Sequence, residues 1–355
     1  MPSSDDLDAL VAAAQGGDDA AFGQLVERLR PELVVHAYRL LASMEDAEEA
    51  VQESLLQAWR HITGFQRRSS ARTWLYRITT NTCLARRTRR RRRQAILAAG
   101  TMAGTVPAPI AMTVPWLEAC PDDLLDLVAA GQADPAAAAT SRETIEIAYV
   151  AALQHLPSRQ RAALVLRDVL GWPAEQAAAA MEVSVAALNS SLQRARARLR
   201  EVLEPERSQW RAATPTDGEE ADHVRRFIDA IERADDDALL SILAEDVVVG
   251  HQPGAGGNHS DEPTWYAGRA TVLEAWAPAL HHPVPLEMRM IPVRVNRQPA
   301  VATYIRLPGT DHHRAFALNV FRIAHDRVAE IATLSTTSFA ALGLPIEAVD
   351  PGQLG

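Results

Sequence analysis

The chain of 355 residues is long enough for two or three domains, and its hydrophobic fraction of 47% is sufficient for packed cores. No apolar stretch of about 18 residues occurs and residues 1–8 are acidic, so we expect neither a membrane span nor a signal peptide. The two cysteines, Cys83 and Cys120, are expected to be buried; they indicate a reducing compartment, the cytoplasm, and argue against a disulfide framework.

The formal net charge of −9, taken alone, speaks against nucleic acid as a partner, but the charge is unevenly distributed. Residues 64–93 and 185–200 contain many arginines and no Asp or Glu, and the chain contains no lysine. Arginine presents a planar fork that can grip phosphate or guanine with two hydrogen bonds. The clustering of the arginines therefore favours nucleic acid as a partner, although the net charge of the whole chain does not.

Residues 16–93 are expected to be wholly helical. Apolar side chains from Phe22 to Leu41 follow helical spacing, and Pro31 is expected to bend or divide that run. A second helix is predicted to begin near Asp46, and a third near Ser70 that runs into the arginine block. Residues 94–140 are rich in Ala, Pro, Gly and Thr, which predicts a linker with one short helix at residues 124–128.

The strongest local pattern is a helix-turn-helix in residues 171–200. A short Ala-rich helix is predicted at residues 173–181, then a turn at Glu182, with Ser184 as the N-cap of a second helix. This turn usually prefers glycine, and a positive φ at Glu182 would cost about 1 kcal/mol. The second helix is expected to bury Val185, Leu188, Leu192, Ala195 and Leu199. Its other side suits base edges and phosphates, and a helical hairpin with a solvated arginine face is the alternative.

From residue 223 onward the pattern changes to helices mixed with strands. An amphipathic helix around Phe227 is followed by β-like runs at residues 286–295, 300–307, 315–323 and 327–334. This order predicts an α+β domain with one curved sheet. The adjacent histidines at 281–282 and 312–313 would point to opposite faces of a strand, so we expect no shared metal, and the sequence predicts no cofactor.

Residues 46–60 closely resemble the most typical helix of the sigma-70 family. The resemblance implies that this helix docks on the coiled coil of the β′ subunit of RNA polymerase. The expected docking residues are Asp46, Glu49, Gln52, Glu53 and Leu56. An acidic helix face suits a basic partner helix, and an ordinary solvated surface is the alternative.

Residues 72–78, together with Asn81, look like the family's promoter-melting segment that reads the minus-ten element. The expected DNA contacts are Arg67, Arg68, Ser69, Arg72, Thr73, Trp74, Tyr76, Arg77, Asn81, Arg86 and Arg87. Aromatic rings among arginines suit unstacked bases and their backbone, although Trp74 in the core with Tyr76 at its edge is the alternative. The arginine block at residues 86–93 would hold phosphate by charge alone, and a disordered basic tail is its alternative.

Residues 156–200 resemble the family's domain that reads the minus-thirty-five element. The expected contacts are Ser184, Ala186, Ala187, Asn189, Ser190, Gln193, Arg194, Arg196 and Arg198. Because only a linker separates the two helical units, the chain resembles the extracytoplasmic-function group, and residues 114–123 resemble a motif of its SigG-type subgroup. The resemblance implies that this linker threads toward the active-site cleft and RNA exit path of the polymerase. Our own hypothesis is that the acids Asp122, Asp123 and Asp126 mimic nucleic acid there.

Residues 227–269 resemble the SnoaL-like domains that are fused to some sigma factors. The implied fold is a cone of helices around a bent sheet with a pocket, whose candidate residues are Asp246, His251, Trp265, Tyr266 and His325. Some relatives are isomerases and cyclases, so one hypothesis is an enzyme with Asp246 or a histidine as general base. We favour a regulatory domain that binds an unknown small ligand or the sigma domains, because no convincing acid–base pair is present.

The sequence therefore predicts a multidomain chain of two all-α sigma domains and an α+β SnoaL-like cone with a curved sheet. The expected segments are sigma domain 2 (1–93), a linker (94–140), sigma domain 4 with the helix-turn-helix (141–205), a linker (206–218), the regulatory domain (219–345) and a tail (346–355). The predicted function is promoter recognition and melting without catalytic residues. Its partners would be core RNA polymerase, through the β′ and β subunits, and promoter DNA, with no membrane. The alternatives are a helix-turn-helix regulator that needs no polymerase, and an isomerase or cyclase carrying DNA-binding modules.

Overall fold

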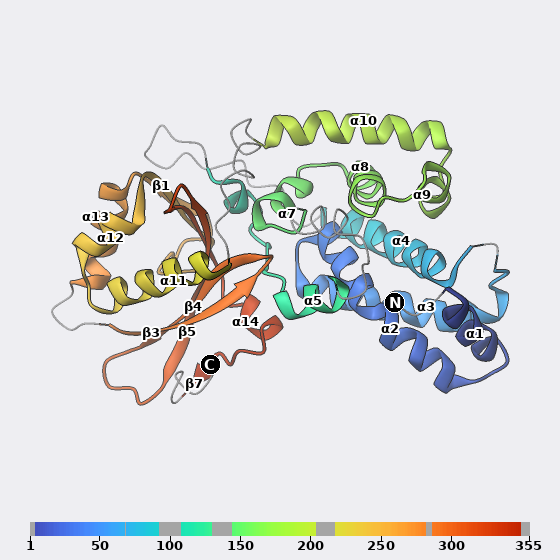
Figure 1. Cartoon of the computed structure of the whole chain (residues 1–355), viewed down its shortest axis with the longest axis horizontal. Helices are drawn as coiled ribbons and strands as arrows, with labels where there is room; N and C mark the ends of the chain where they lie inside the picture. The colour runs from blue at the N-terminus through green and yellow to red at the C-terminus, as the bar shows by residue number, and fades with distance from the viewer. Residues whose placement is uncertain are drawn as a thin grey trace. The chain divides into compact units, whose positions relative to one another are not determined.

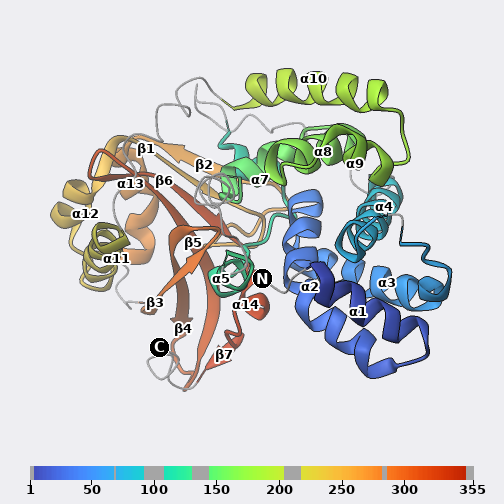
Figure 2. The same ribbon diagram turned by 45° about the vertical axis from the view of Figure 1, so that its right-hand side comes forward.

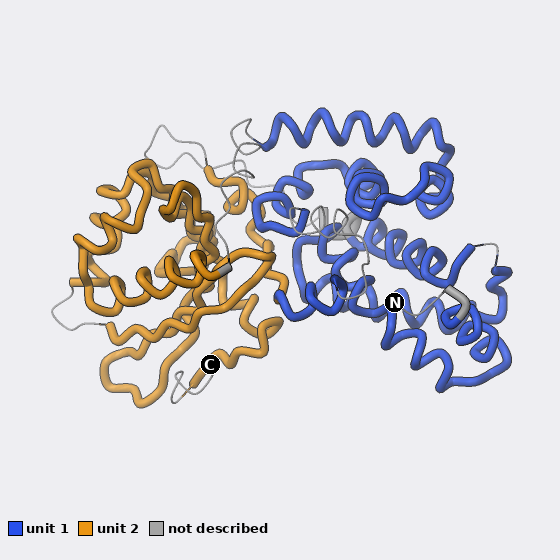
Figure 3. Tube along the Cα trace, viewed as in Figure 1, with its two compact units in different colours: residues 1–95, 122–203 blue, residues 96–121, 204–355 orange. Residues whose placement is uncertain are grey.

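A computed structural model describes residues 4–67, 69–91, 108–129, 144–203, 217–281 and 286–348. The chain divides into two compact units (Figure 3). Unit 1 comprises residues 1–95 and 122–203, and unit 2 comprises residues 96–121 and 204–355. The chain thus enters unit 2, returns to unit 1 and enters unit 2 again, so that part of the segment expected to be a linker belongs to the C-terminal unit.

Unit 1 begins with a helical block, hereafter the first helical block (Figure 1). Its elements are α1 (Ser4–Gln15), α2 (Asp19–Leu41), α3 (Met44–His61), the 3₁₀ turn η1 (Ile62–Gly64) and α4 (Ala71–Arg91). Helix α2 continues through Pro31, so of the two expected effects the proline does not divide this run. Leu29 and Leu33 are buried on either side of Pro31, and their packing outweighs the missing backbone hydrogen bond.

The rest of unit 1 is also helical. A short helix, α5 (Asp122–Ala129), confirms the one expected near residues 124–128 and packs against α2. The second helical block comprises α7 (Ile147–Gln154), α8 (Ser158–Leu164), the π-helical turn η3 (Val165–Val169), α9 (Ala174–Ala180) and α10 (Val185–Val202). None of the helices in the described part of the chain is long and apolar enough to cross a membrane.

The helix-turn-helix is formed by α9 and α10. Glu182 in the turn has a φ of 54°, as expected, and the Ser184 hydroxyl accepts a hydrogen bond from the backbone N–H of Ala187 at 3.2 Å. Leu188 is buried as predicted, together with Leu192 and Ala195. Val185 was expected in the buried stripe but is 38% exposed, because it is the first residue of α10 and no preceding turn of that helix shields it.

Unit 2 contains one sheet with helices packed on it. Its strands are β1 (Leu243–His251), β2 (Thr264–Ala267), β3 (Glu287–Val295), β4 (Gln298–Arg306), β5 (His313–Ala324), β6 (Arg327–Leu334) and β7 (Glu347–Ala348). The strand order is β2-β1-β6-β5-β4-β3, with β7 beside β5; β1 and β6 are parallel, and the other pairs are antiparallel. Strands β3 to β6 confirm the four predicted β-like runs.

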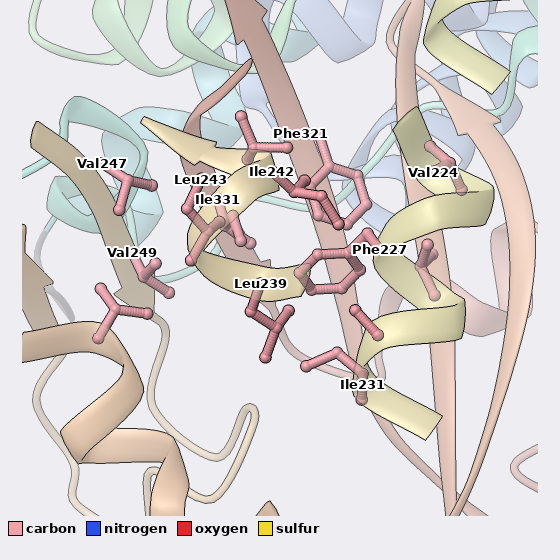
Figure 4. Packing of buried hydrophobic residues seen from close by; sticks show 14 of the residues in the cluster. Val224, Phe227, Ile231, Leu239, Ile242, Leu243, Val247, Val249, Phe321 and Ile331 are labelled. Carbon is pink, nitrogen blue, oxygen red and sulfur yellow. The ribbon is translucent and has the colours of Figure 1, made fainter. Parts of the chain in front are cut away.

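The helices of unit 2 are α11 (Asp217–Glu232), α12 (Asp236–Ile242), α13 (Arg269–Leu280) and α14 (Ser338–Ala341), preceded by the 3₁₀ turn η2 (Ile110–Thr113). The predicted amphipathic helix is α11, and it buries Val224, Phe227 and Ile231 in an apolar cluster (Figure 4). The rings of Phe227 and Phe321 of β5 meet edge to face at 4.9 Å between centroids. This cluster attaches α11 to the sheet.

Both cysteines lie in the described part of the chain and are buried, as expected, and neither forms a disulfide bond. Burial raises the pKa of the Cys83 thiol to about 12. Because the thiolate is the reactive form, Cys83 is a small core residue and not a nucleophile.

Candidate functional site

One face of α3 is exposed and carries the expected docking residues. Ser43 caps the helix, accepting a hydrogen bond from the backbone N–H of Asp46 at 3.1 Å. The buried side consists of Met44, Ala47, Ala50, Val51, Ser54 and Ala58. On the outer side Glu49, Gln52 and Leu56 are exposed, Leu56 by 52%, whereas Asp46 and Glu53 are half-buried.

An aromatic pair borders this face. Trp59 is 37% exposed, and its ring packs against Phe22 of α2 with centroids 4.9 Å apart. The structure therefore brings acidic, amide and apolar side chains together on the outer side of α3.

Arg86 of α4 contacts the same face. Its guanidinium donates hydrogen bonds to Glu49 at 2.8 Å and to Glu53 at 3.1 Å. The sequence assigned Arg86 to DNA and the two glutamates to a protein partner, whereas the structure pairs them. The side chain of Arg87, also an expected DNA contact, lies outside the described residues.

A cavity of about 480 Å³ opens where α4 begins. Trp74 forms one wall; it is 5% exposed and stacks on Phe65 with centroids 4.6 Å apart. The other lining residues are Arg60, His61, Thr63, Gly64, Gln66, Ser69 and Arg77. The sequence analysis identified Ser69, Trp74 and Arg77 but not the other residues that line the cavity. Phe65 and Gln66 belong to the stretch without Asp or Glu that begins at Gly64, and this charge pattern could have pointed to them.

The remaining expected minus-ten residues lie in different environments. Arg67 has a φ of 52° and donates to the Gln15 side chain at 2.8 Å, Asn81 is half-buried, and Arg68 lies outside the described residues. Thr73 lies beside Ser70, its hydroxyl 2.9 Å from that of the serine.

Tyr76 is 4% exposed, and its hydroxyl donates to Glu32 at 3.1 Å. Arg72 pairs with the same carboxylate at 3.2 Å. Burial raises the pKa of Glu32, an effect that Arg72 and the Tyr76 hydroxyl oppose. The Tyr76 ring therefore offers no open face for a base in this conformation.

Helix α10 presents the expected minus-thirty-five residues on its surface. Ala186, Ala187, Asn189 and Gln193 are exposed and Ser190 is half-buried. All three arginines are exposed but make intramolecular hydrogen bonds. Arg194 donates to the Ser190 hydroxyl at 2.7 Å, and Arg198 to the His155 carbonyl at 3.0 Å.

Arg196 makes the strongest of these contacts. Its guanidinium donates two hydrogen bonds to the carboxylate of Asp168 in η3, at 2.6 and 2.8 Å. The arrangement is the two-pronged geometry that arginine also uses on phosphate.

The structure does not gather the five candidate pocket residues of the C-terminal domain. His251 is buried and meets the Tyr266 ring edge to face at 6.0 Å, with Trp265 half-buried next to Tyr266 on β2. Asp246 and His325, by contrast, are exposed, His325 in the turn between β5 and β6.

Burial lowers the pKa of His251 to about 4. Its Nδ1 has no hydrogen-bond partner among the described residues. Within the described ranges, no group of three or more His, Cys, Asp or Glu side chains is arranged to hold a metal ion.

Unit 2 holds residues 108–121, which the sequence predicted to be linker. The backbone N–H of Cys120 donates to the Asn296 side chain at 2.7 Å, and the backbone N–H of Asn296 donates to the Cys120 carbonyl at 2.9 Å. The backbone N–H of Ala119 donates to the Ser338 hydroxyl at 3.0 Å. The segment is thus bonded to the turn after β3 and to α14.

A second set of contacts fixes the earlier part of this segment. The fully buried Gln252 amide donates to the carbonyls of Val114 at 3.3 Å and Leu117 at 3.0 Å. Met112 is buried against Gly250 of β1, where an added Cβ would lie 2.5 Å from the methionine Cγ. A side chain at position 250 would therefore force Met112 to move.

Comparisons with known proteins agree with this organisation. Sigma-70 region 2 matches residues 25–93, sigma-70 region 4 matches residues 147–199, and a SnoaL-like domain matches residues 224–331. The chain is 39% identical over 351 residues to the ECF RNA polymerase sigma factor SigG of Mycobacterium tuberculosis, covering 96% of this chain and 90% of the relative. The chain belongs to the extracytoplasmic-function group of sigma factors.

Other relatives of this sigma factor cover less of it or share only its fold. SigM of Mycobacterium tuberculosis is 31% identical over 194 residues, 55% of this chain and 83% of the relative. The crystal structure of the extracytoplasmic function sigma factor SigJ of Mycobacterium tuberculosis has a TM-score of 0.55 at 22% identity, with coverage of 91% of this chain and 99% of that one. The first and second helical blocks are therefore sigma regions 2 and 4, followed by the predicted SnoaL-like α+β domain.

The family assignment gives the protein's function. Sigma factors bind core RNA polymerase and promoter DNA, and this one directs transcription initiation.

Proposed function

We propose that this sigma factor docks on the coiled coil of the polymerase β′ subunit through the exposed face of α3. The observation that carries the proposal is Leu56, which is 52% exposed beside Gln52 and the acidic side chains. Burial of such a leucine on a partner contributes about 1.5–3 kcal/mol, and the acids select a basic partner. The β subunit is the further polymerase partner that we propose, for the linker and the second helical block.

The cavity beside Trp74 is proposed to hold one unstacked base of the minus-ten element. The half-buried Phe65 ring supplies a stacking surface, whereas Trp74, which stacks on Phe65, is only 5% exposed; Arg60 and Arg77 line the same cavity with positive charge for the backbone. The other contacts predicted for this element remain part of the proposal. Tyr76 would be reached only after a rearrangement, since its ring is buried.

Helix α10 is proposed to read the minus-thirty-five element in the major groove. The small side chains of Ala186 and Ala187 permit close approach, and the exposed amides of Asn189 and Gln193 suit adenine edges. The arginines of this helix would exchange their intramolecular acceptors for phosphate oxygens.

The SnoaL-like domain is proposed to regulate initiation without catalysis. Asp246 and His325 are exposed, so neither lies in the low-dielectric surroundings that tune a general base. The domain instead binds residues 108–121 of the linker, and that segment cannot simultaneously thread through the polymerase. We infer that the domain and the polymerase compete for the linker. A small ligand near His251 and Tyr266 would bias this competition.

Two rival functions make different predictions. A regulator that acts without polymerase would bind duplex promoter DNA stably as an isolated protein. An isomerase or cyclase would turn over a ketone substrate, and Asp246→Ala would abolish that turnover.

The docking proposal is tested by measuring affinity for core polymerase and run-off transcription of Leu56→Ala. Loss of most of the leucine side chain should weaken core binding about tenfold. Leu307→Ala is the matched control, because Leu307 is 41% exposed but lies at the end of β4, outside the proposed docking face. Equal affinities of the two variants would refute docking through α3.

A further inference from the structure

The end of helix α1 contacts residues 62–67, hereafter the minus-ten loop, which line much of the cavity beside Trp74. Helix α1 packs on α2 and also contacts η1 and α4 (Figure 2). Gln15, the last residue of α1, is half-buried, and its side-chain amide donates to the backbone carbonyls of Ile62 at 3.0 Å and Phe65 at 2.7 Å. The oxygen of the same side chain accepts two hydrogen bonds from a guanidinium of the loop, at 2.8 and 3.1 Å. One glutamine therefore joins α1 to the loop through four hydrogen bonds.

The position of Gln15 is itself fixed by the packing and the end of α1. Leu7, Val11 and Ala14 are buried along one side of the helix, at the i, i+4, i+7 spacing of an apolar stripe. The helix is terminated by Gly17, which has a φ of 94° and donates its backbone N–H to the Ala14 carbonyl at 3.1 Å. The Gln15 amide therefore approaches the loop from a defined place.

The minus-ten loop has a backbone that needs such support. Arg67, which supplies the guanidinium bound by Gln15, has a φ of 52°. A residue with a side chain persists in this conformation only where its surroundings hold it there. The contact also places the positive guanidinium at the negative C-terminal end of α1.

Phe65 connects these hydrogen bonds to the cavity. Its carbonyl accepts from Gln15, while its ring lines the cavity and stacks on Trp74 with centroids 4.6 Å apart. Gln15 is not one of the lining residues, so it acts on a bound base only through the loop. If the loop were not held, base binding would include the entropy cost of ordering it.

We propose that Gln15 is a positioning residue for promoter melting, which holds the minus-ten loop in the shape that receives an unstacked base. The inference rests on the proposed role of the cavity beside Trp74. It extends the minus-ten site to α1, which precedes residues 25–93, the part that matches sigma-70 region 2. Arginine has five N–H donors, so Arg67 can bind Gln15 and a DNA phosphate at the same time.

The proposal is tested by binding of single-stranded DNA to the holoenzyme. Core polymerase with the full-length sigma factor is titrated with a fluorescent oligonucleotide that carries the non-template minus-ten sequence of a promoter found by run-off transcription. The titration is repeated with one abasic position at a time. We expect Gln15→Ala to weaken binding of the complete oligonucleotide about tenfold, because the loop is no longer preorganised. At one abasic position this loss should disappear, since no base then enters the cavity.

Further variants separate positioning from a general loss of stability. Gln15→Glu should weaken binding at least as much as Gln15→Ala, because a carboxylate has no N–H to donate to the two backbone carbonyls. Gln24→Ala, at an exposed position of α2, is the matched control and should bind like the unmodified protein. If Gln15→Ala folds poorly, Arg67→Gln serves instead, since it removes two of the four hydrogen bonds from the other side. Its loss should be about threefold and should disappear at the same abasic position.

Phe65→Ala distinguishes failure of the inference from failure of the proposed function. If Phe65→Ala weakens binding but Gln15→Ala does not, the positioning role is overturned and the cavity remains a base site. The same conclusion follows if the loss caused by Gln15→Ala is equal at every abasic position. If Phe65→Ala leaves binding of the complete oligonucleotide unchanged, the cavity holds no base, and the proposed role of the cavity is overturned together with the inference.

Discussion

The guanidinium of Arg86 donates a hydrogen bond to the carboxylate of Glu53 at 3.1 Å and so joins α4 to the proposed polymerase-docking face of α3. The same guanidinium also bonds Glu49, so one cation partly neutralises two acids that a basic partner helix would use. A partner that docks there must compete with Arg86. Such competition would link polymerase binding to release of an arginine near DNA.

Arg86→Gln should therefore bind core polymerase more tightly than the unmodified protein. We expect a two- to fivefold gain, roughly, at low salt, because partly exposed ion pairs contribute about 1 kcal/mol or less. Affinity is measured by titration with core enzyme at several salt concentrations. Arg30→Gln is the matched control, since Arg30 pairs with Glu48 across α2 and α3 without contacting a proposed docking residue. Weaker binding by Arg86→Gln would show that Arg86 is itself a polymerase contact.

The sequence predicted those features of the fold that depend on residues close together in the chain. The Ser184 cap and the positive φ of Glu182 follow from turn chemistry within a few residues, and strands β3 to β6 follow from runs of β-forming residues. The exposed Val185 was missed because periodicity marks a face of a helix but does not say where that face ends.

Contacts between distant residues were not predictable in this way. Cys120 bonds Asn296 across 176 positions, so composition alone indicated a free linker where the C-terminal domain binds it. The burial of Tyr76 likewise depends partly on Trp172, in the other helical block. The candidate pocket assembled only in part, because residue types alone do not show that Asp246 and His325 are exposed while His251 is buried against Tyr266.

Glu182→Gly should stabilise the second helical block. Relief of the positive φ of 54° is worth about 1 kcal/mol, from which the greater backbone entropy of unfolded glycine subtracts part, leaving about 0.5 kcal/mol. Denaturant unfolding measures the difference. Glu175→Gly within α9 should have the opposite sign and cost about 1 kcal/mol. Destabilisation by both substitutions would mean that Glu182 makes a compensating contact.

Gln252→Ala should release the linker from the SnoaL-like domain. Loss of the hydrogen bonds to Val114 and Leu117 should raise maleimide labelling of Cys120 about 10- to 100-fold, because Cys120 is fully buried in the bound segment. Mass spectrometry separates the two cysteines, and Cys83 in unit 1 is the internal control. Unchanged labelling of Cys120 would show that the remaining contacts hold the segment without Gln252.

Stability should fall in mild acid because of His36. Burial, with a smaller contribution from Arg39, lowers the pKa of His36 from 6.5 to about 3. Below pH 6.5 the unfolded chain therefore binds a proton on His36 that the folded chain does not bind. The stability contributed by neutral His36 is complete above pH 6.5 and is lost as the pH falls toward 3. Between pH 7 and pH 5 this histidine alone should account for a loss of about 2 kcal/mol. His36→Gln, compared by urea unfolding at both pH values, should show a correspondingly smaller loss; an equal loss would assign the effect to other groups.

Asp168→Asn should strengthen duplex DNA binding by the holoenzyme. Asp168 accepts two hydrogen bonds from the Arg196 guanidinium, at 2.6 and 2.8 Å. Loss of its negative charge frees the arginine to bind a DNA phosphate and removes an acid that repels the phosphate backbone. We expect a roughly three- to tenfold gain in affinity, with the slope of log K against log salt steeper by about 1. Arg196→Ala should lower the affinity and make the salt slope shallower. Glu201→Gln, at the exposed end of α10, is the control for the change in net charge. If Asp168→Asn behaved like Glu201→Gln, Arg196 would be a structural contact of η3 and not a phosphate ligand.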